Sequence, residues 1–116
     1  MEVGAKITTR SLGDVSVVDV CGRITLSGGA GELGDTLRDI ASKGGKKILV
    51  NLCEVSYLDS SAIGELISGL TTITNLGGKL KLLSLNQRVM DLLRITKSHA
   101  IFEIHDDEAA ALRSFV

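Results

Sequence analysis

Residues 47–83 read KILVNLCEVSYLDSSAIGELISGLTTITNLGGKLKLL, and this stretch decides the fold. Its first six residues form a short apolar run, which is typical of a buried central strand. A helix is predicted after it, because apolar residues recur there at the spacing of one helix face: Ile63, Leu66, Ile67, Leu70 and Ile73. Gly77-Gly78 ends this helix, and residues 79–83 form the next strand. A strand-helix-strand unit predicts a right-handed crossover and parallel strands.

Two strands and a helix are predicted ahead of this unit. Residues 6–12 and 15–21 are strand-like and are separated by Gly13-Asp14, which indicates a hairpin. The second of these strands carries valines on both faces, as an interior strand does. The helix follows the glycine-rich residues 27–31, and its apolar positions share one face: Leu33, Leu37, Ile40 and Ala41.

The C-terminal third continues the alternation. Asn86 is suited to cap a third helix, residues 101–104 form a last short strand, and Asp106 is suited to cap a terminal helix. The predicted order is therefore ββαβαβαβα. We expect residues 1–116 to form one α/β domain whose mixed sheet opens with an antiparallel hairpin, continues with parallel strands and carries about four helices on one side.

Composition excludes several classes of function. The chain has 116 residues and a formal net charge of -1, without the clustered basic residues of a nucleic-acid surface. No apolar stretch is long enough to span a membrane, and no secretory signal pattern opens the chain, so we expect a cytoplasmic protein without membrane insertion. Cys21 and Cys53 lack metal-ligand spacing and are predicted to be buried, reduced thiols.

The candidate site is Asp59-Ser60-Ser61, at the start of the second predicted helix. All three are preferred N-cap residues, yet one helix needs only one cap, which leaves a hydroxyl free. A helix N-terminus carries partial positive charge and unpaired N–H groups, so it tolerates an anion. Phosphorylation of Ser60 would therefore change the surface charge without unfolding the helix, as a reversible binding switch requires.

Residues 58–64, LDSSAIG, follow a central strand and resemble the signature of STAS-domain anti-sigma-factor antagonists. The resemblance extends over nearly the whole chain, through Gly22-Arg23-Ile24, the Gly77-Gly78-Lys79-Leu80 turn and the helix at residues 86–95. It implies a non-catalytic STAS domain without a cofactor.

The resemblance also implies partners and residue roles. The unphosphorylated domain would bind an anti-sigma factor that is also a serine kinase. Phosphorylation of Ser60 would release it, and a PP2C-type serine phosphatase would reset the switch. Asp59 would position the Ser60 hydroxyl and repel the neighbouring phosphate, while Ser61 would cap the helix or make a secondary contact.

Two departures from the family's pattern concern the same helix. Ala62 replaces the usual glycine, and Glu65 stands where many relatives carry an apolar residue, one turn from Ser60 on the expected docking face. Both are expected to affect the choice of partner or the phosphorylation of Ser60. Gly28 and Gly29, before the first helix, are expected near the partner-binding face. They do not form a P-loop, and no residue there specifies a nucleotide.

Other functions are less well supported. Ser60 has no nucleophile-elbow sequence around it, and His99 and His105 lie far along the chain, so a hydrolase triad is not indicated. No set of residues has metal-ligand spacing, so no metal site is expected. Three alternatives to the switch stay open: a STAS scaffold subunit of a signalling complex, a cytoplasmic STAS component of a lipid or anion transporter, and a small enzyme with an unrecognised site.

Overall fold

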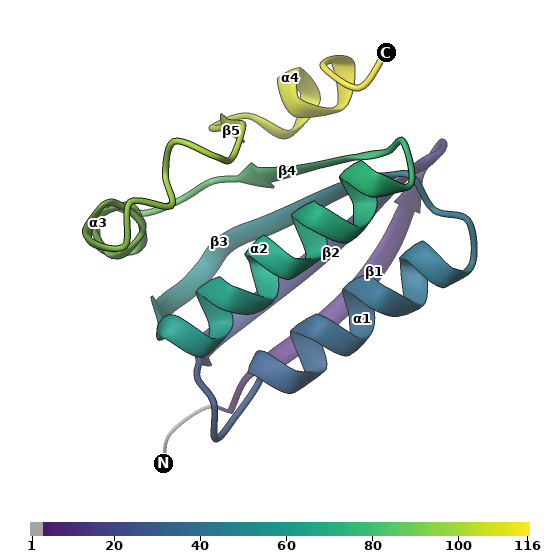
Figure 1. Ribbon diagram of the computed structural model, residues 1–116. Helices are drawn as coiled ribbons and strands as arrows, with labels where there is room; N and C mark the ends of the chain where they lie inside the picture. The colour runs from purple at the N-terminus through teal and green to yellow at the C-terminus, as the bar shows by residue number, and fades with distance from the viewer. Residues whose placement is uncertain (1–3) are drawn as a thin grey trace.

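Strands and helices alternate along residues 4–116, which are the part of the chain that the computed structural model describes (Figure 1). The elements are β1 (Lys6–Leu12), β2 (Val15–Ile24), α1 (Ala30–Ser42), β3 (Lys47–Leu58), α2 (Ser60–Asn75), β4 (Lys79–Leu83), α3 (Gln87–Ile95), β5 (Ile104–His105) and α4 (Glu108–Arg113). The predicted order ββαβαβαβα is confirmed. Residues 1–3, which belong to the N-terminal segment without a secretory signal pattern, lie outside the described residues.

The sheet is mixed, as predicted, and its strands lie in the order β1-β2-β3-β4-β5. β1 and β2 are antiparallel, and each later neighbour is parallel. Gly13 begins the tight turn of the opening hairpin with φ 63°, a conformation that glycine adopts without steric cost. Because β2, β3 and β4 are parallel, the loops that follow them meet at one end of the sheet.

Helices cover both faces of the sheet, so the expectation of helices on one side is wrong. α1 and α2 lie side by side over one face (Figure 1), and the main core forms beneath them. On the opposite face, Ala111 and Phe115 at the C-terminal end of the chain pack on four sheet residues, Val15, Val17, Leu49 and Leu83. The valines at positions 15 and 17 therefore face α4, whereas Val18 and Val20 face the main core.

Several boundaries differ from the prediction. β3 continues to Leu58, because Glu54, Val55, Tyr57 and Leu58 pair with the end of β2 across two register shifts. The last strand is Ile104–His105, and Asp107 rather than Asp106 caps α4. None of the helices in residues 4–116 has the length and apolarity that a membrane crossing requires.

The two cysteines are not buried as predicted. Cys53 is exposed and Cys21 is partly exposed, and both are free thiols. Side chains alternate along a strand. Leu52 points into the main core, so the following Cys53 points to the other face of the sheet, at a level that α4 does not cover.

Candidate functional site

The candidate site lies where β2 and β3 end and α2 begins. Ile24 and Leu58 are neighbours in the parallel register, and both are fully buried. One residue beyond, the Asp59 N–H donates to the Ile24 carbonyl oxygen at 3.1 Å. The core thus brings the loop after β2 against the first turn of α2.

Asp59 holds both segments with its side chain. Its Oδ1 accepts from the Ala62 N–H at 2.9 Å, which caps α2, and its Oδ2 accepts from the Leu26 N–H at 2.8 Å. Asp59 is therefore the cap, so the expectation that Ser61 caps the helix is wrong, while the alternative of a secondary contact by Ser61 stays a prediction. Asp59 has extended backbone, with ψ -179°, so the helix begins at Ser60 and Ser61 already lies within its first turn.

Ser60 is the first residue of a 16-residue helix and is exposed. Within residues 4–116 its hydroxyl has no hydrogen-bond partner. In this described part of the chain no hydrogen bond joins Asp59 to this hydroxyl, since the Asp59 oxygens accept from backbone N–H groups, and the expected positioning of Ser60 by Asp59 stays a prediction. What remains is an accessible hydroxyl on a rigidly capped helix end, in a partial positive potential that favours an anion.

The loop after β2 places an apolar side chain beside this helix end. Thr25 and Gly28 exchange backbone hydrogen bonds of 2.8 and 3.0 Å, so residues 25–28 form a tight turn with Leu26 at its tip. Leu26 is 79% exposed. Gly28 is exposed, whereas Gly29 is buried at the start of α1 with φ 98°, where a Cβ would lie 2.6 Å from the Ala5 side chain.

The two residues that depart from the family's pattern are placed differently from Ser60. Ala62 is buried, so any part that it takes in binding passes through the backbone. Glu65 is five residues from Ser60, about 140° around the helix, and its side chain points toward α1. Its Oε2 lies 3.4 Å from Arg38 Nη1 and fills the space where Gly34 has no Cβ. Glu65 therefore joins two helices on a side of α2 that differs from that of Ser60, and its expected part in partner binding stays a prediction.

Two cations lie against the ring of Tyr57, one residue before the buried end of β3. The Arg23 guanidinium lies 4.5 Å from the centre of the Tyr57 ring, and the Arg88 guanidinium lies 5.5 Å from it. No sequence motif pointed to either Arg23 or Arg88 as part of the site. The available signal was positional, since Arg23 and Tyr57 each lie one residue before the buried pair Ile24 and Leu58.

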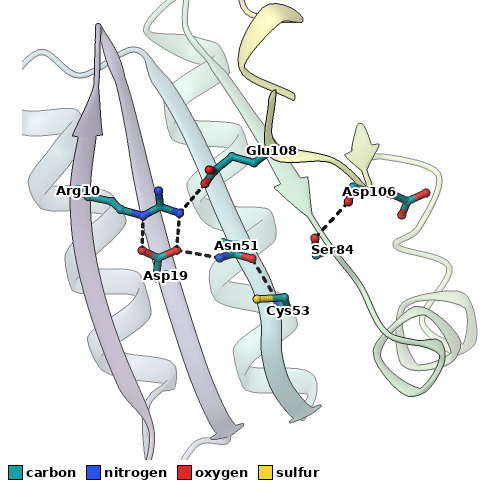
Figure 2. Close-up of polar contacts among 7 residues, drawn as sticks. All are labelled: Arg10, Asp19, Asn51, Cys53, Ser84, Asp106 and Glu108. Carbon is teal, nitrogen blue, oxygen red and sulfur yellow. Dashed lines mark hydrogen bonds and ion pairs between the residues drawn. The ribbon is translucent and has the colours of Figure 1, made fainter. Parts of the chain in front are cut away.

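A second polar cluster lies on the sheet face opposite α1 and α2 (Figure 2). Arg10 binds both oxygens of Asp19, at 2.6 and 3.1 Å, and also Glu108 at the start of α4. Asn51 donates to Asp19 at 2.8 Å. The Arg10 guanidinium holds the pKa of the Asp19 carboxyl below its ordinary value. The charged groups of this cluster are paired with one another, and Glu108 belongs to α4, so the cluster holds α4 against the sheet. In residues 4–116, no group of three or more His, Cys, Asp or Glu residues could hold a metal ion.

Sequence comparison relates the chain to known proteins. The family model for the STAS domain matches residues 6–111. A protein of Thermotoga neapolitana with the provisional name of anti-sigma factor antagonist is 35% identical over 74 residues, which are 64% of this chain and 66% of that protein. The match therefore spans slightly less than two thirds of that relative.

Solved structures have the same fold. A crystal structure of a provisionally named anti-sigma factor antagonist from Thermotoga maritima has a TM-score of 0.87 at 24% identity, over 94% of this chain and 93% of that chain. The anti-sigma factor antagonist SpoIIAA matches in its unphosphorylated form with a TM-score of 0.81 at 16% identity, over 96% of this chain and 99% of that one. SpoIIAA of Bacillus in its phosphorylated form matches with a TM-score of 0.75 at 14% identity, over 94% of this chain and 98% of that one. These likenesses show the fold.

Proposed function

The chain belongs to the STAS domain family, and we propose that it is an anti-sigma-factor antagonist whose binding is switched by phosphorylation of Ser60. The observation that carries this proposal is the exposed Ser60 hydroxyl, which has no hydrogen-bond partner within residues 4–116 and begins a capped helix. The relatives named as anti-sigma factor antagonists support the role. SpoIIAA, which has this fold, has been solved with and without phosphate.

The partner of the unphosphorylated form is an anti-sigma factor that also acts as a serine kinase. Its docking surface would include the Ser60 hydroxyl and the exposed Leu26 side chain, which the two hydrogen bonds of Asp59 hold on neighbouring segments. An apolar side chain beside a small neutral hydroxyl suits a partner that desolvates both. In this account the STAS domain contributes no catalytic residue of its own, and the phosphoryl transfer chemistry belongs to the kinase.

Phosphorylation would change this surface in charge far more than in shape. A phosphoserine carries a charge of about -1.5 to -2 at neutral pH. The first turn of α2 tolerates that charge because its N–H groups point toward it. The Asp59 carboxylate next to it is present in both forms, so the phosphate adds to an existing negative charge, and a partner that fits the unphosphorylated surface would have to desolvate the added anion. We expect release of the partner, followed by removal of the phosphate by a PP2C-type phosphatase in the cytoplasm.

Intact-protein mass spectrometry tests the switch. The protein is incubated with ATP and the anti-sigma kinase encoded nearby, alongside Ser60→Ala and the matched control Ser61→Ala. We expect one phosphate on the natural protein and on Ser61→Ala, and none on Ser60→Ala. Phosphate on Ser60→Ala would contradict the assignment of Ser60. Stable kinase binding without any phosphate would support an unswitched antagonist, and neither binding nor phosphate would support the scaffold or transporter-subunit alternatives.

A further inference from the structure

β1 is an edge strand of the sheet, and nothing in residues 4–116 pairs with its outer side. It lies at one end of the strand order, pairs within the described part of the chain with β2 alone, and six of its seven residues are exposed. An exposed strand edge presents unpaired N–H and C=O groups and so offers a template for another strand.

The hairpin geometry identifies which groups are free. Gly13 and Asp14 form a two-residue turn, and Leu12 and Val15 are the pair that closes it. In such a hairpin the closing pair exchanges hydrogen bonds, and every second residue does the same along the ladder. Arg10 and Thr8 therefore bond to β2, whereas the backbone groups of three residues point outward: Ile7, Thr9 and Ser11.

This edge lacks most of the devices that protect strand edges. β1 contains no proline, and its pairing with β2 has no register shift. The charge of Arg10 is neutralised by Asp19 and Glu108, on the sheet face opposite α1 and α2 (Figure 2). The residues whose backbone points outward are uncharged, and two of them are β-branched, which favours strand pairing.

We propose that a second copy of the chain pairs with this edge, antiparallel and two-fold symmetric about Thr9, to give a dimer with a continuous ten-stranded sheet. Two-fold pairing sets Thr9 opposite Thr9, Ile7 opposite Ser11, Thr8 opposite Arg10 and Lys6 opposite Leu12. No like charges meet directly in this register. Pairing of β1 with β5, the strand at the other edge of a second copy, would give an open-ended chain of copies. It is disfavoured because β5 has only two residues. The pairing therefore closes as a dimer.

The dimer leaves both candidate sites accessible. Because β1 strands pair antiparallel, the parallel strands of the two copies run in opposite directions. The start of α2 in one copy then lies at the end of the joint sheet opposite to that in the other. The assembly would be a bivalent antagonist, although the edge pairing does not depend on the proposed role of Ser60.

Sedimentation equilibrium tests the pairing, with the full-length chain at several concentrations. We expect the natural protein to approach twice its monomer mass of 12.2 kDa. Thr9→Pro removes an outward N–H without removing a bond to β2, so it should give a folded monomer. Thr9→Val keeps the N–H and should stay dimeric. Thr9→Lys sets two cations opposite each other and should also be monomeric, which covers the case in which the proline variant fails to fold. A natural protein that is monomeric throughout, or a Thr9→Lys variant that stays dimeric, would overturn the proposal.

Disulfide trapping tests the register. In a Cys21→Ser, Cys53→Ser background, Thr9→Cys places two thiols on residues about 5.5 Å apart between Cα atoms, within disulfide range. Oxidation should give a covalent dimer. Thr8→Cys in the same background faces Arg10 of the other copy and should not cross-link. Equal cross-linking of the two variants would contradict the two-fold axis at Thr9.

Discussion

The starts of α2 and α3 use the same device for different ends. Each follows a parallel strand. In each, one side-chain atom of the cap residue forms a hydrogen bond to its own helix, and the other forms one to a neighbouring segment. Asp59 accepts from Ala62 N and from Leu26 N. Asn86 accepts from Val89 N at 2.9 Å and donates to the Val55 carbonyl oxygen at 2.7 Å.

The difference lies in the second partner and in the residue that follows the cap. Val55 is 1% exposed, so Asn86 satisfies a carbonyl in a buried residue, whereas Leu26 is 79% exposed and its N–H can be hydrated. After Asn86 comes Gln87, whose amide binds Asp91, and after Asp59 comes Ser60, whose hydroxyl has no partner in residues 4–116. The side chains of Asn86 and Gln87 at the α3 start are thus bound within the protein, while the α2 start leaves the Ser60 hydroxyl exposed and without a partner in residues 4–116.

The largest expected effect separates the two caps by stability. Asn86→Ala removes a helix cap and leaves the Val55 carbonyl without its donor, so we expect a loss of about 2–4 kcal/mol in the free energy of unfolding. Asp59→Ala removes a cap of the same kind, but water replaces its bond to Leu26, so we expect about 1–2 kcal/mol. Urea unfolding followed by far-UV circular dichroism measures both. Equal losses would show that burial of the second partner does not distinguish the two sites.

Exchanging the two cap residues, Asn86→Asp and Asp59→Asn, tests the assigned hydrogen bonds one at a time. Asn86→Asp keeps the cap but sets a carboxylate oxygen against the Val55 carbonyl, which should cost about 1–3 kcal/mol at neutral pH. The repulsion disfavours the charged form and raises the pKa of the introduced carboxyl, so the protonated form regains the bond. The deficit relative to the natural protein is therefore small below the ordinary carboxyl pKa, grows as pH rises toward the raised pKa, and is complete above it.

Asp59→Asn is the matched swap and should cost less than about 1 kcal/mol. The cap is kept, but an amide NH2 now faces the Leu26 N–H, so the loop at residues 25–29 is released. Hydrogen exchange read by mass spectrometry should show faster exchange in this loop with unchanged protection of β3. A pH-independent deficit for Asn86→Asp, or an unchanged loop in Asp59→Asn, would contradict the assigned hydrogen bonds.

A reference site is needed to read the acid response of these variants. Lys81 Nζ lies 2.8 Å from the Glu103 carboxylate, and with His105 it lowers the pKa of Glu103 from 4.5 to about 2. A lowered folded-state pKa contributes stability above pH 4.5 that is lost as pH falls toward 2. Glu103 is 53% exposed, so solvent screening limits the contribution to less than about 1 kcal/mol. Glu103→Gln should flatten the decline in urea midpoint between pH 5 and pH 2, and an unchanged decline would place the acid response elsewhere.

Periodicity predicted most of the fold because the apolar stripes of α1 and α2 and the apolar runs of β2 and β3 each match one geometry. It did not predict that α4 covers the second face, because a helix of six residues has too short a pattern to show which strands it covers. Nor did it predict the extension of β3 to Leu58. That extension depends on pairing with β2 across register shifts, which is a tertiary effect.

The position of the candidate site in the chain was predicted, but the residue that caps the helix was not. Asp59, Ser60 and Ser61 do lie at the helix start, yet local preference alone could not decide which of them caps it. The backbone at Asp59 decides this, because the bond from Asp59 N to Ile24 O holds the residue outside the helix. The position of Glu65 was missed for a related reason. The direction of the Glu65 side chain depends on Gly34 of α1, which has no Cβ and so leaves room for it. No rule of residue spacing links a glycine in α1 to a residue in α2.

The most direct test of the central claim is the affinity of the anti-sigma factor for the protein with and without phosphate on Ser60, measured by calorimetry. Ser60→Glu is measured alongside, with Gln87→Glu as the control that adds the same charge at the start of α3. We predict that phosphate weakens binding by at least about tenfold, or 1.4 kcal/mol, that Ser60→Glu weakens it partly, and that Gln87→Glu leaves it unchanged. Equal affinities of the phosphorylated and unphosphorylated forms would contradict the account.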